Sequence, residues 1–492
     1  MKKTNNTIQA FWVSIGSLFA FGFSIVSSMI LSRYFPKEDY GTYKQVIYVY
    51  STFLFLFTLG LPKAFPYYLP RIPIDQAKSL IKKITNLFFI LGACFSILLY
   101  VFSPQIAYFL KNPDLELAIK IFSPVPFFML PTMGLEGILA TYQRTQYLTI
   151  YTVSSTILKL LCVALPVIFF HGGYLQAITG FVIASFISFL IAIYFKYLPI
   201  KHSGNERSLI SYKEIFRFSL PLLYASFWGL IITSSDQFFI SRYFGSAVFA
   251  DFSNGSMELP FVGMVVGATS MVLEPLFSRQ IHEKLSPEKD IFPVWNSVFE
   301  KTVKIIYPLV LFFLFFADVV IVVLFGGMYE NSGIYFKIKL IVNFFTLITF
   351  YPLIIAIGAN KFYANVHMYG AIILVLFEYL SILVFKSPYV ITIISVVCQI
   401  GRIMVMLLFI SNFFEIKLIK LFPIKLIGKI LFPSIILLFL IRYIFMDLLL
   451  MKGLILLCLT FGIYLILFAI WSFIMKIDYI SIVKPLFLKK DL

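Results

Sequence analysis

Apolar stretches of about 20 residues recur from one end of the chain to the other, and they constrain its fold more than any other feature. A helix of that length crosses a hydrocarbon core of about 30 Å. Of the 492 residues, 60% are hydrophobic and 13% are charged, whereas an ordinary soluble domain has about 25% charged residues. The sequence therefore predicts an all-α integral membrane protein with about fourteen transmembrane helices.

The predicted spans form two sets of six, followed by two more. The first six are 9–32, 43–61, 84–102, 119–141, 148–170 and 174–195. The second six are 215–240, 248–276, 303–325, 334–358, 366–385 and 390–410, and the last two are 427–445 and 453–475. We therefore expect an N-terminal lobe at 1–198, a cytoplasmic linker at 199–214, a C-terminal lobe at 215–411, and a region at 412–492 that holds a cytoplasmic connection, the last two spans and a basic tail.

A repeated tetrapeptide supports the division into two similar sets. Ser-Arg-Tyr-Phe occurs at 32–35 and again at 241–244, each time at the outer end of a long apolar stretch. Its placement indicates one six-span unit used twice. The equivalent arginines, Arg33 and Arg242, either reach toward the outer membrane interface or contact a substrate that leaves the protein.

The distribution of Lys and Arg predicts the orientation, because positive residues are retained on the cytoplasmic side. With the amino terminus inside, about 27 of the 40 Lys and Arg residues fall in cytoplasmic segments and about 11 outside. An even number of spans then places both termini in the cytoplasm. The net charge of +17 indicates topology and contact with anionic membrane lipids rather than nucleic-acid binding.

One polar stripe with a cation lies in the fifth span. Thr152, Ser155, Thr156 and Lys159 have the spacing that places them on one helical face. A charged side chain near the bilayer centre costs about 2.5 to 3.5 kcal/mol, so we expect Lys159 to have either a function or a stabilising partner. The stripe predicts either a water-filled cavity that receives an anionic group or a buried ion pair of Lys159 with Glu136.

A second stripe of the same kind lies in the twelfth span. Thr392, Ser395, Gln399 and Arg402 have nearly the same spacing and again end in one cation. The two stripes predict either a shared cavity with substrate-binding residues in both halves or interhelical hydrogen bonds that only stabilise the bundle.

Acidic residues within the predicted spans form another candidate set. Asp236, Glu258 and Glu378 are candidates for binding a coupling cation, Na⁺ or H⁺. Glu274 and Asp318 have a weaker case, because they lie near span ends or breaks.

Several function classes are disfavoured. There is no Gly-rich phosphate loop for ATP, and the four cysteines lack the paired spacings of a zinc site. The predicted loops are too short for a catalytic domain, so we expect neither an enzyme nor a cofactor, and no certain metal site. In the eighth span, Gly263 and Gly267 share a face with Ser270, a pattern that allows close helix approach.

Three short motifs carry a resemblance to a known family. They are ILSRYFPKEDYGTY at 30–43, DQFFISRYFG at 236–245, and LFGGMY at 324–329. In this order and on these spans, the chain resembles flippases of polysaccharide repeat units of the Wzx type, in the multidrug/oligosaccharidyl-lipid/polysaccharide exporter superfamily. Lipid II flippases of similar fold carry an Arg-Asp pair in the first span, where this chain has Ser24, Ser27 and Ser28, which argues against a peptidoglycan precursor as substrate.

The resemblance implies two six-helix lobes in a V around a central cavity that opens alternately to the two sides of a bacterial cytoplasmic membrane. The substrate would be an oligosaccharide repeat unit on undecaprenyl diphosphate, for O-antigen, capsule or another surface polysaccharide. A polysaccharide polymerase and chain-length machinery would be partners. A glycan and a diphosphate cannot cross hydrocarbon without hydrogen-bond partners, which a cationic cavity supplies.

Two alternatives stay open. The first is a cation-coupled multidrug exporter of the same superfamily. In some relatives a seventh-span Asp and an eleventh-span Asn and Asp hold a sodium ion; Asp236 and Glu378 match in type and span, whereas Leu374, one turn before Glu378, occupies the position of an amide. The second is a polytopic membrane enzyme such as a repeat-unit polymerase, or an acyltransferase that uses His367 as its base.

Overall fold

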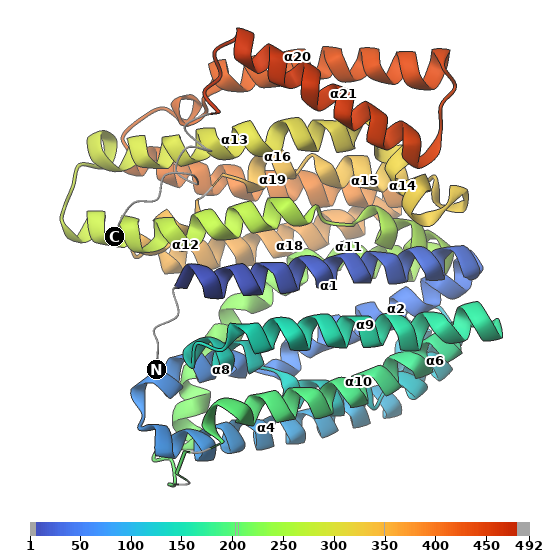
Figure 1. The fold of residues 1–492 in the computed structure, drawn as a ribbon, viewed down its shortest axis with the longest axis vertical. Helices are drawn as coiled ribbons and strands as arrows, with labels where there is room; N and C mark the ends of the chain where they lie inside the picture. The colour runs from blue at the N-terminus through green and yellow to red at the C-terminus, as the bar shows by residue number, and fades with distance from the viewer. Residues whose placement is uncertain (1–5, 202, 205, 349, 480–492) are drawn as a thin grey trace. The chain divides into compact units, whose positions relative to one another are not determined.

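The protein is a bundle of helices in the computed structural model, which describes residues 6–201, 203–204, 206–348 and 350–479 (Figure 1). Every regular element within these residues is helical. Ten helices are long and apolar enough to cross a membrane, and three pairs of bent helices raise the number of candidate spans to 13. The predicted all-α membrane fold is confirmed.

The tenth predicted span, 334–358, is divided into short helices. These are α15 (Ser332–Leu340), α16 (Asn343–Thr346) and α17 (Tyr351–Ala356). The side chain of Asn343 donates to the backbone oxygen of Leu340 at 3.2 Å, and such local bonds compete with a continuing helix. Hydropathy predicts an apolar segment here and does not predict its division into short helices.

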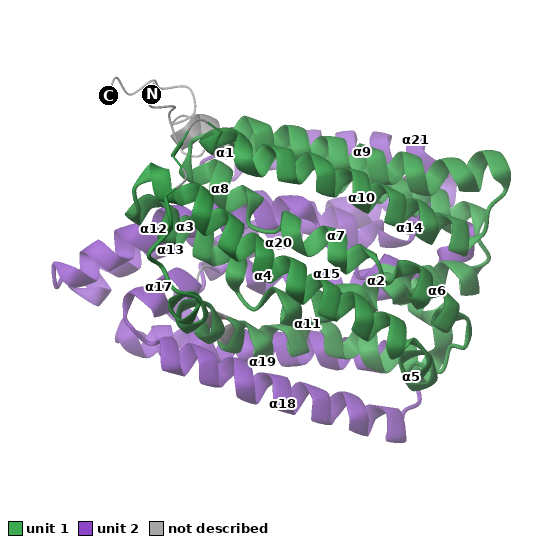
Figure 2. Cartoon of the chain, turned by 90° about the horizontal axis from the view of Figure 1, so that it is seen from below, with its two compact units in different colours: residues 1–253 green, residues 254–492 purple. Residues whose placement is uncertain are grey.

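Packing divides the chain into two compact units, residues 1–253 and 254–492 (Figure 2). The first unit therefore includes nearly all of α11 (Tyr212–Gly255), which corresponds to the seventh predicted span. The lobe boundaries predicted at 198 and 215 follow the repeat in the sequence, whereas the two units are defined by packing. The lobe boundaries therefore stay a prediction.

In unit 1, α9 (Thr145–Phe170) packs between two long partners, α1 (Asn6–Tyr34) and α10 (Tyr174–Tyr197) (Figure 1). Gly180 of α10 lies so close to α9 that an added Cβ would come within 1.9 Å of the Cys162 backbone oxygen. A side chain there would force α9 and α10 apart. Between α1 and α9 in the chain lie seven further α-helices: α2 (Lys37–Thr58), α3 (Ala64–Tyr68), α4 (Ile74–Val101), α5 (Ser103–Phe109), α6 (Asp114–Phe122), α7 (Val125–Met129) and α8 (Leu135–Thr141).

Both copies of the repeated tetrapeptide precede a break in the helix. Pro36 follows the first copy with φ −52° and ψ 152°, and α2 begins after it. Gly245 follows the second copy with φ 84° and ψ 176°, which only glycine adopts without strain. The helix is thus interrupted at equivalent positions, by an extended proline after the first copy and by a glycine with positive φ after the second.

The kink at Gly245 corrects one predicted boundary. The eighth span was expected to begin at 248, whereas α11 continues through the kink to Gly255, and α12 (Pro260–His282) begins five residues later. Glu258 therefore lies in the connection between α11 and α12, not in a span, and its side chain is exposed.

Several long helices of unit 2 pack against one another. The long helix α18 (Asn360–Val384) packs against α19 (Pro388–Phe413), while α20 (Ile424–Arg442) contacts both α13 (Phe292–Phe315) and α21 (Gly453–Ile474). The short α14 (Ala317–Phe325) continues α13 after a sharp bend of 72°. On α12, nothing lies within 4 Å of a Cβ added at Gly263 or Gly267, so the close approach expected at these glycines is wrong.

A forked ion pair joins α14 to the end of α20. Two nitrogens of Arg442 donate to the two carboxylate oxygens of Asp318, at 2.9 Å and 2.6 Å. Arg442 also donates to the backbone oxygen of Phe315. Both side chains of the pair are 29% exposed, so the pair is partly shielded from water. Asp318 is therefore a structural residue in this unit.

Replacing Arg442 by methionine is expected to destabilise unit 2 by about 2 kcal/mol, because the Asp318 carboxylate then stays half-buried without its partner. Thermal denaturation in detergent measures the effect. The control is Arg279→Met, which removes an exposed partner of Glu283 and should leave the denaturation temperature nearly unchanged, because water screens exposed ion pairs. Equal shifts for the two variants would contradict a stabilising role for the Asp318 pair.

Candidate functional site

Lys159, the predicted cation of the fifth span, lines a cavity of about 160 Å³ within unit 1. We call it the two-lysine cavity, because Lys44 of α2 lines it as well. Four helices contribute its walls. The lining residues are Phe23, Ser24, Ser27, Ser28, Leu31, Tyr43, Lys44, Ile47, Thr156, Lys159, Leu160, Val163 and Phe181.

Helix periodicity and one turn in the chain bring these residues together. Ser24, Ser27 and Ser28 share a face of α1 at spacings of three and four residues, as Thr156 and Lys159 do on α9. The break at Pro36 reverses the chain, so that α2 runs back along α1. Lys44 thereby comes to lie opposite Ser28, sixteen residues earlier in the chain.

Each ammonium group is held by neutral neighbours. Lys44 Nζ donates to Ser28 Oγ at 3.1 Å and lies 5.2 Å from the centre of the Tyr40 ring. Lys159 Nζ lies 5.0 Å from the centre of the Phe181 ring, within reach of a cation–π attraction. The described residues that line the cavity include no carboxylate. Its walls therefore carry a net positive charge that suits an anion.

The alternative of a buried Lys159–Glu136 pair is not observed. Glu136 is exposed on α8, and no ion pair between it and Lys159 occurs among the described residues. Only part of the polar stripe on α9 lines the cavity. Thr156 lines the cavity and donates its hydroxyl to the Thr152 backbone oxygen at 2.7 Å, whereas Thr152 and the buried Ser155 are not among the lining residues.

The second stripe lies on α19 in unit 2 and has different neighbours. Ser395 is buried, and Lys339 of α15 donates to its hydroxyl oxygen at 3.3 Å. Arg402 packs over Gly370 of α18, where an added Cβ would come 3.3 Å from its Cδ. Gln399 is partly buried on the same helix.

The three candidate coupling residues differ in burial and in their surroundings. Asp236 of α11 is 2% exposed, and its Oδ1 accepts the backbone N–H of Gln237 at 2.8 Å. Glu378 of α18 is completely buried in the other unit. Glu258 is exposed in the short connection between α11 and α12. Among the described residues no group of three or more His, Cys, Asp or Glu side chains could hold a metal ion.

The two arginines of the repeated tetrapeptide differ in their surroundings. Arg242 donates to the backbone oxygen of Phe109 and lies 4.5 Å from the centre of that ring. It therefore stabilises the carboxyl end of α5, where a positive charge is favourable. Arg33 is exposed near the end of α1. Neither lines the two-lysine cavity.

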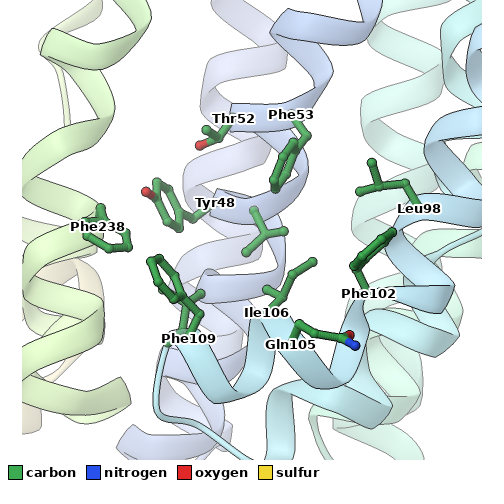
Figure 3. A pocket seen from close by; sticks show the side chains of 11 residues that line it. Tyr48, Thr52, Phe53, Leu98, Phe102, Gln105, Ile106, Phe109 and Phe238 are labelled. Carbon is green, nitrogen blue, oxygen red and sulfur yellow. The ribbon is translucent and has the colours of Figure 1, made fainter.

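A larger cavity of about 510 Å³ in unit 1 has the opposite character (Figure 3). Tyr48 and Phe53 of α2, Phe102, Phe109 of α5 and Phe238 of α11 point into it, and its polar lining is confined to a few groups. A cavity with such walls suits hydrocarbon rather than a charged group.

Comparison with known proteins identifies the class to which this fold and site belong. Residues 8–281 match the family described as "Polysaccharide biosynthesis protein", so the chain belongs to that family. The protein named "Putative O-antigen transporter" from Shigella flexneri is 24% identical over 383 residues, which cover 74% of this chain and 87% of the relative.

Solved transporters share the fold. The lipid II flippase MurJ in an inward closed conformation superimposes with a TM-score of 0.68 at 18% identity, covering 95% of this chain and 99% of that one. A multidrug resistance MATE family transporter of the MOP superfamily, in an inward-facing conformation, gives 0.63 at 14% identity and covers 83% and 99%. The predicted resemblance to a family of polysaccharide biosynthesis proteins is confirmed, and these solved structures show that the fold is shared.

Proposed function

We propose that the protein is an alternating-access flippase that moves oligosaccharide repeat units linked to undecaprenyl diphosphate from the cytoplasmic to the outer leaflet. Membership in the polysaccharide biosynthesis family and the transporter fold support this reading. The membrane is then a bacterial cytoplasmic membrane, and both termini lie in the cytoplasm, as the Lys and Arg distribution predicts.

The two-lysine cavity is the observation that carries the proposal. Two lysines line one cavity whose described lining includes four hydroxyl-bearing serine and threonine residues and no carboxylate, and a diphosphate diester carries one negative charge on each phosphate. The cavity volume of about 160 Å³ is below the roughly 300 Å³ of the smallest drug-sized ligand pockets. We therefore assign it to the diphosphate alone, with the glycan outside it.

The serines of α1 fit the same role. Ser24, Ser27 and Ser28 supply hydroxyl groups that donate to phosphate oxygens without adding charge. Thr156 lines the same cavity, but its hydroxyl already donates to the Thr152 backbone oxygen, so it is not counted among these donors. Arg402 and Ser395 of unit 2 are proposed as further substrate contacts, and Lys339 joins them because it bonds to Ser395.

The proposal is tested by deleting the gene and by reconstituting the purified protein. Deletion should abolish surface polysaccharide and leave lipid-linked repeat units in the inner leaflet. In proteoliposomes, a lipid-linked oligosaccharide should become accessible to a membrane-impermeant oxidant only when the protein is present. Export of cationic drugs with normal surface glycan would instead support the multidrug alternative, and accumulation of flipped but unpolymerised units would support a polymerase.

Coupling to Na⁺ or H⁺ through Asp236 or Glu378 is a separate proposal about the drive. Both carboxyl groups are buried in helices, where an unneutralised charge is costly. A Na⁺ gradient and a pH gradient are imposed in turn across the same proteoliposomes. If neither gradient changes the flipping rate, Asp236 and Glu378 do not couple transport to Na⁺ or H⁺.

A further inference from the structure

Unit 2 contains a charged cleft of about 580 Å³ that the transport proposal does not use. We call it the basic cleft. It lies where α20 begins and α21 ends, beside the middle of α13. Its lining residues are Glu300, Lys304, Phe422, Pro423, Ile424, Lys425, Leu426, Lys429, Lys476, Ile477 and Asp478.

The basic cleft lies at one membrane face. The candidate span 424–448 starts at the cleft, and the candidate span 453–474 ends there. Since these two spans are consecutive, the beginning of one and the end of the next lie on the same side of the bilayer. The cleft is therefore at the depth of lipid headgroups, and the exposed apolar side chains of Ile424 and Phe473 beside it continue toward the acyl chains.

The charge of the basic cleft favours an anion. Four lysines line it against the two carboxylates of Glu300 and Asp478. Glu300 accepts a bond from Asn296 at 3.0 Å. Lys304 Nζ donates to the backbone oxygen of Asp478 at 3.0 Å, which fixes the ammonium group at the wall. Lys425 and Lys429 are exposed.

The backbone adds to this positive potential. The first turn of α20, residues 424–426, lines the cleft, and no side chain caps that helix end. The amino end of a helix attracts anions through its free N–H groups and its dipole. Mixed apolar and basic walls at a membrane interface are the pattern of sites for anionic lipid headgroups.

We propose that the basic cleft binds the phosphodiester headgroup of an anionic glycerophospholipid, with Lys425 and Lys429 as its main contacts. Lys304 is positioned by its backbone bond and lies at the inner wall. This site belongs to the surrounding membrane rather than to the transported substrate, and it stands whether or not the protein is a flippase.

The test measures lipid binding to the purified full-length protein by native mass spectrometry. Phosphatidylglycerol should bind saturably and phosphatidylcholine should not. Lys425→Gln combined with Lys429→Gln should weaken phosphatidylglycerol binding by about 10- to 30-fold, since each basic residue near a membrane surface contributes on the order of 1 kcal/mol. Both side chains are exposed, so the variant is expected to fold.

The matched control is Lys386→Gln combined with Lys452→Gln, which removes the same charge from exposed loops of the same unit. Lys452 precedes α21 and thus lies at the opposite end of that helix from the cleft. Equal weakening in the control would overturn the proposal in favour of general surface charge. Displacement of the lipid by equimolar inorganic phosphate would overturn it in favour of a soluble-anion site.

Discussion

Replacing Lys44 and Lys159 together by methionine is expected to reduce flipping of a diphosphate-linked oligosaccharide by at least about 100-fold. Each lysine would lose a charge-assisted hydrogen bond to phosphate, worth about 1.5 to 3 kcal/mol. Methionine fills similar space without a charge, and the described cavity lining holds no carboxylate that would be left alone. The measurement is the flipping rate in proteoliposomes at matched protein density.

The same double substitution is expected to raise thermal stability, because two charges are removed from a partly buried site. A structural role for the lysines predicts the opposite sign, so stability and transport together separate the two roles. The conservative variant with arginine at both positions should keep a measurable rate. Lys82→Met, at an exposed position of α4, is the control. Wild-type flipping by the methionine variant would refute the assignment of the two-lysine cavity to the diphosphate.

Gly41→Ala is expected to prevent stable folding of unit 1. An added Cβ would come 1.9 Å from the backbone oxygen of Ser246, so α2 and α11 must separate. Two contacts oppose that movement. Gln45 donates to Ser241 at 2.8 Å, and Lys37 Nζ lies 2.7 Å from a carboxylate oxygen of Asp251. Overpacking alone costs about 1 to 3 kcal/mol, and the broken contacts add to it.

The measurement for Gly41→Ala is the yield of monodisperse protein and its thermal denaturation in detergent. Gly462→Ala is the matched control, because nothing lies within 4 Å of a Cβ added there on α21. Alanine favours a helix over glycine by about 1 kcal/mol, so the control should be neutral or slightly more stable. Similar behaviour of the two variants would mean that α2 and α11 are not in this close contact.

The sequence alone predicts what depends on local properties. Span length and hydropathy are local, so the all-α membrane fold and most spans are predicted correctly. The position of Lys159 on the same helix face as Thr156 is also local, since it follows from the spacing of three residues. The cavity that both residues line is consistent with that prediction.

The remaining features depend on tertiary structure. Lys44 lies at the start of the predicted span 43–61, and only the return of α2 along α1 places it in a cavity. Glu258 falls within an apolar stretch, but the helical segment after the Gly245 kink ends at Gly255 and leaves Glu258 in a connection. The pattern at Gly263 and Gly267 shows which residues share a face and does not show whether another helix packs against that face.

The two-lysine cavity makes the transport cycle sensitive to the membrane voltage. Two lysines line it, and its described walls include no acidic side chain. In the proposed flippase, the two negative charges of the bound diphosphate and the two ammonium groups cancel, so the loaded transition would move little net charge. The empty transition carries the uncompensated positive charge back toward the negative interior, which a membrane voltage favours by up to about 2.3 kcal/mol per charge per 100 mV. We expect flipping in voltage-clamped proteoliposomes to accelerate with inside-negative voltage, and a voltage-independent rate would contradict this. The resting voltage of the cell would then reset the empty carrier without a dedicated ion.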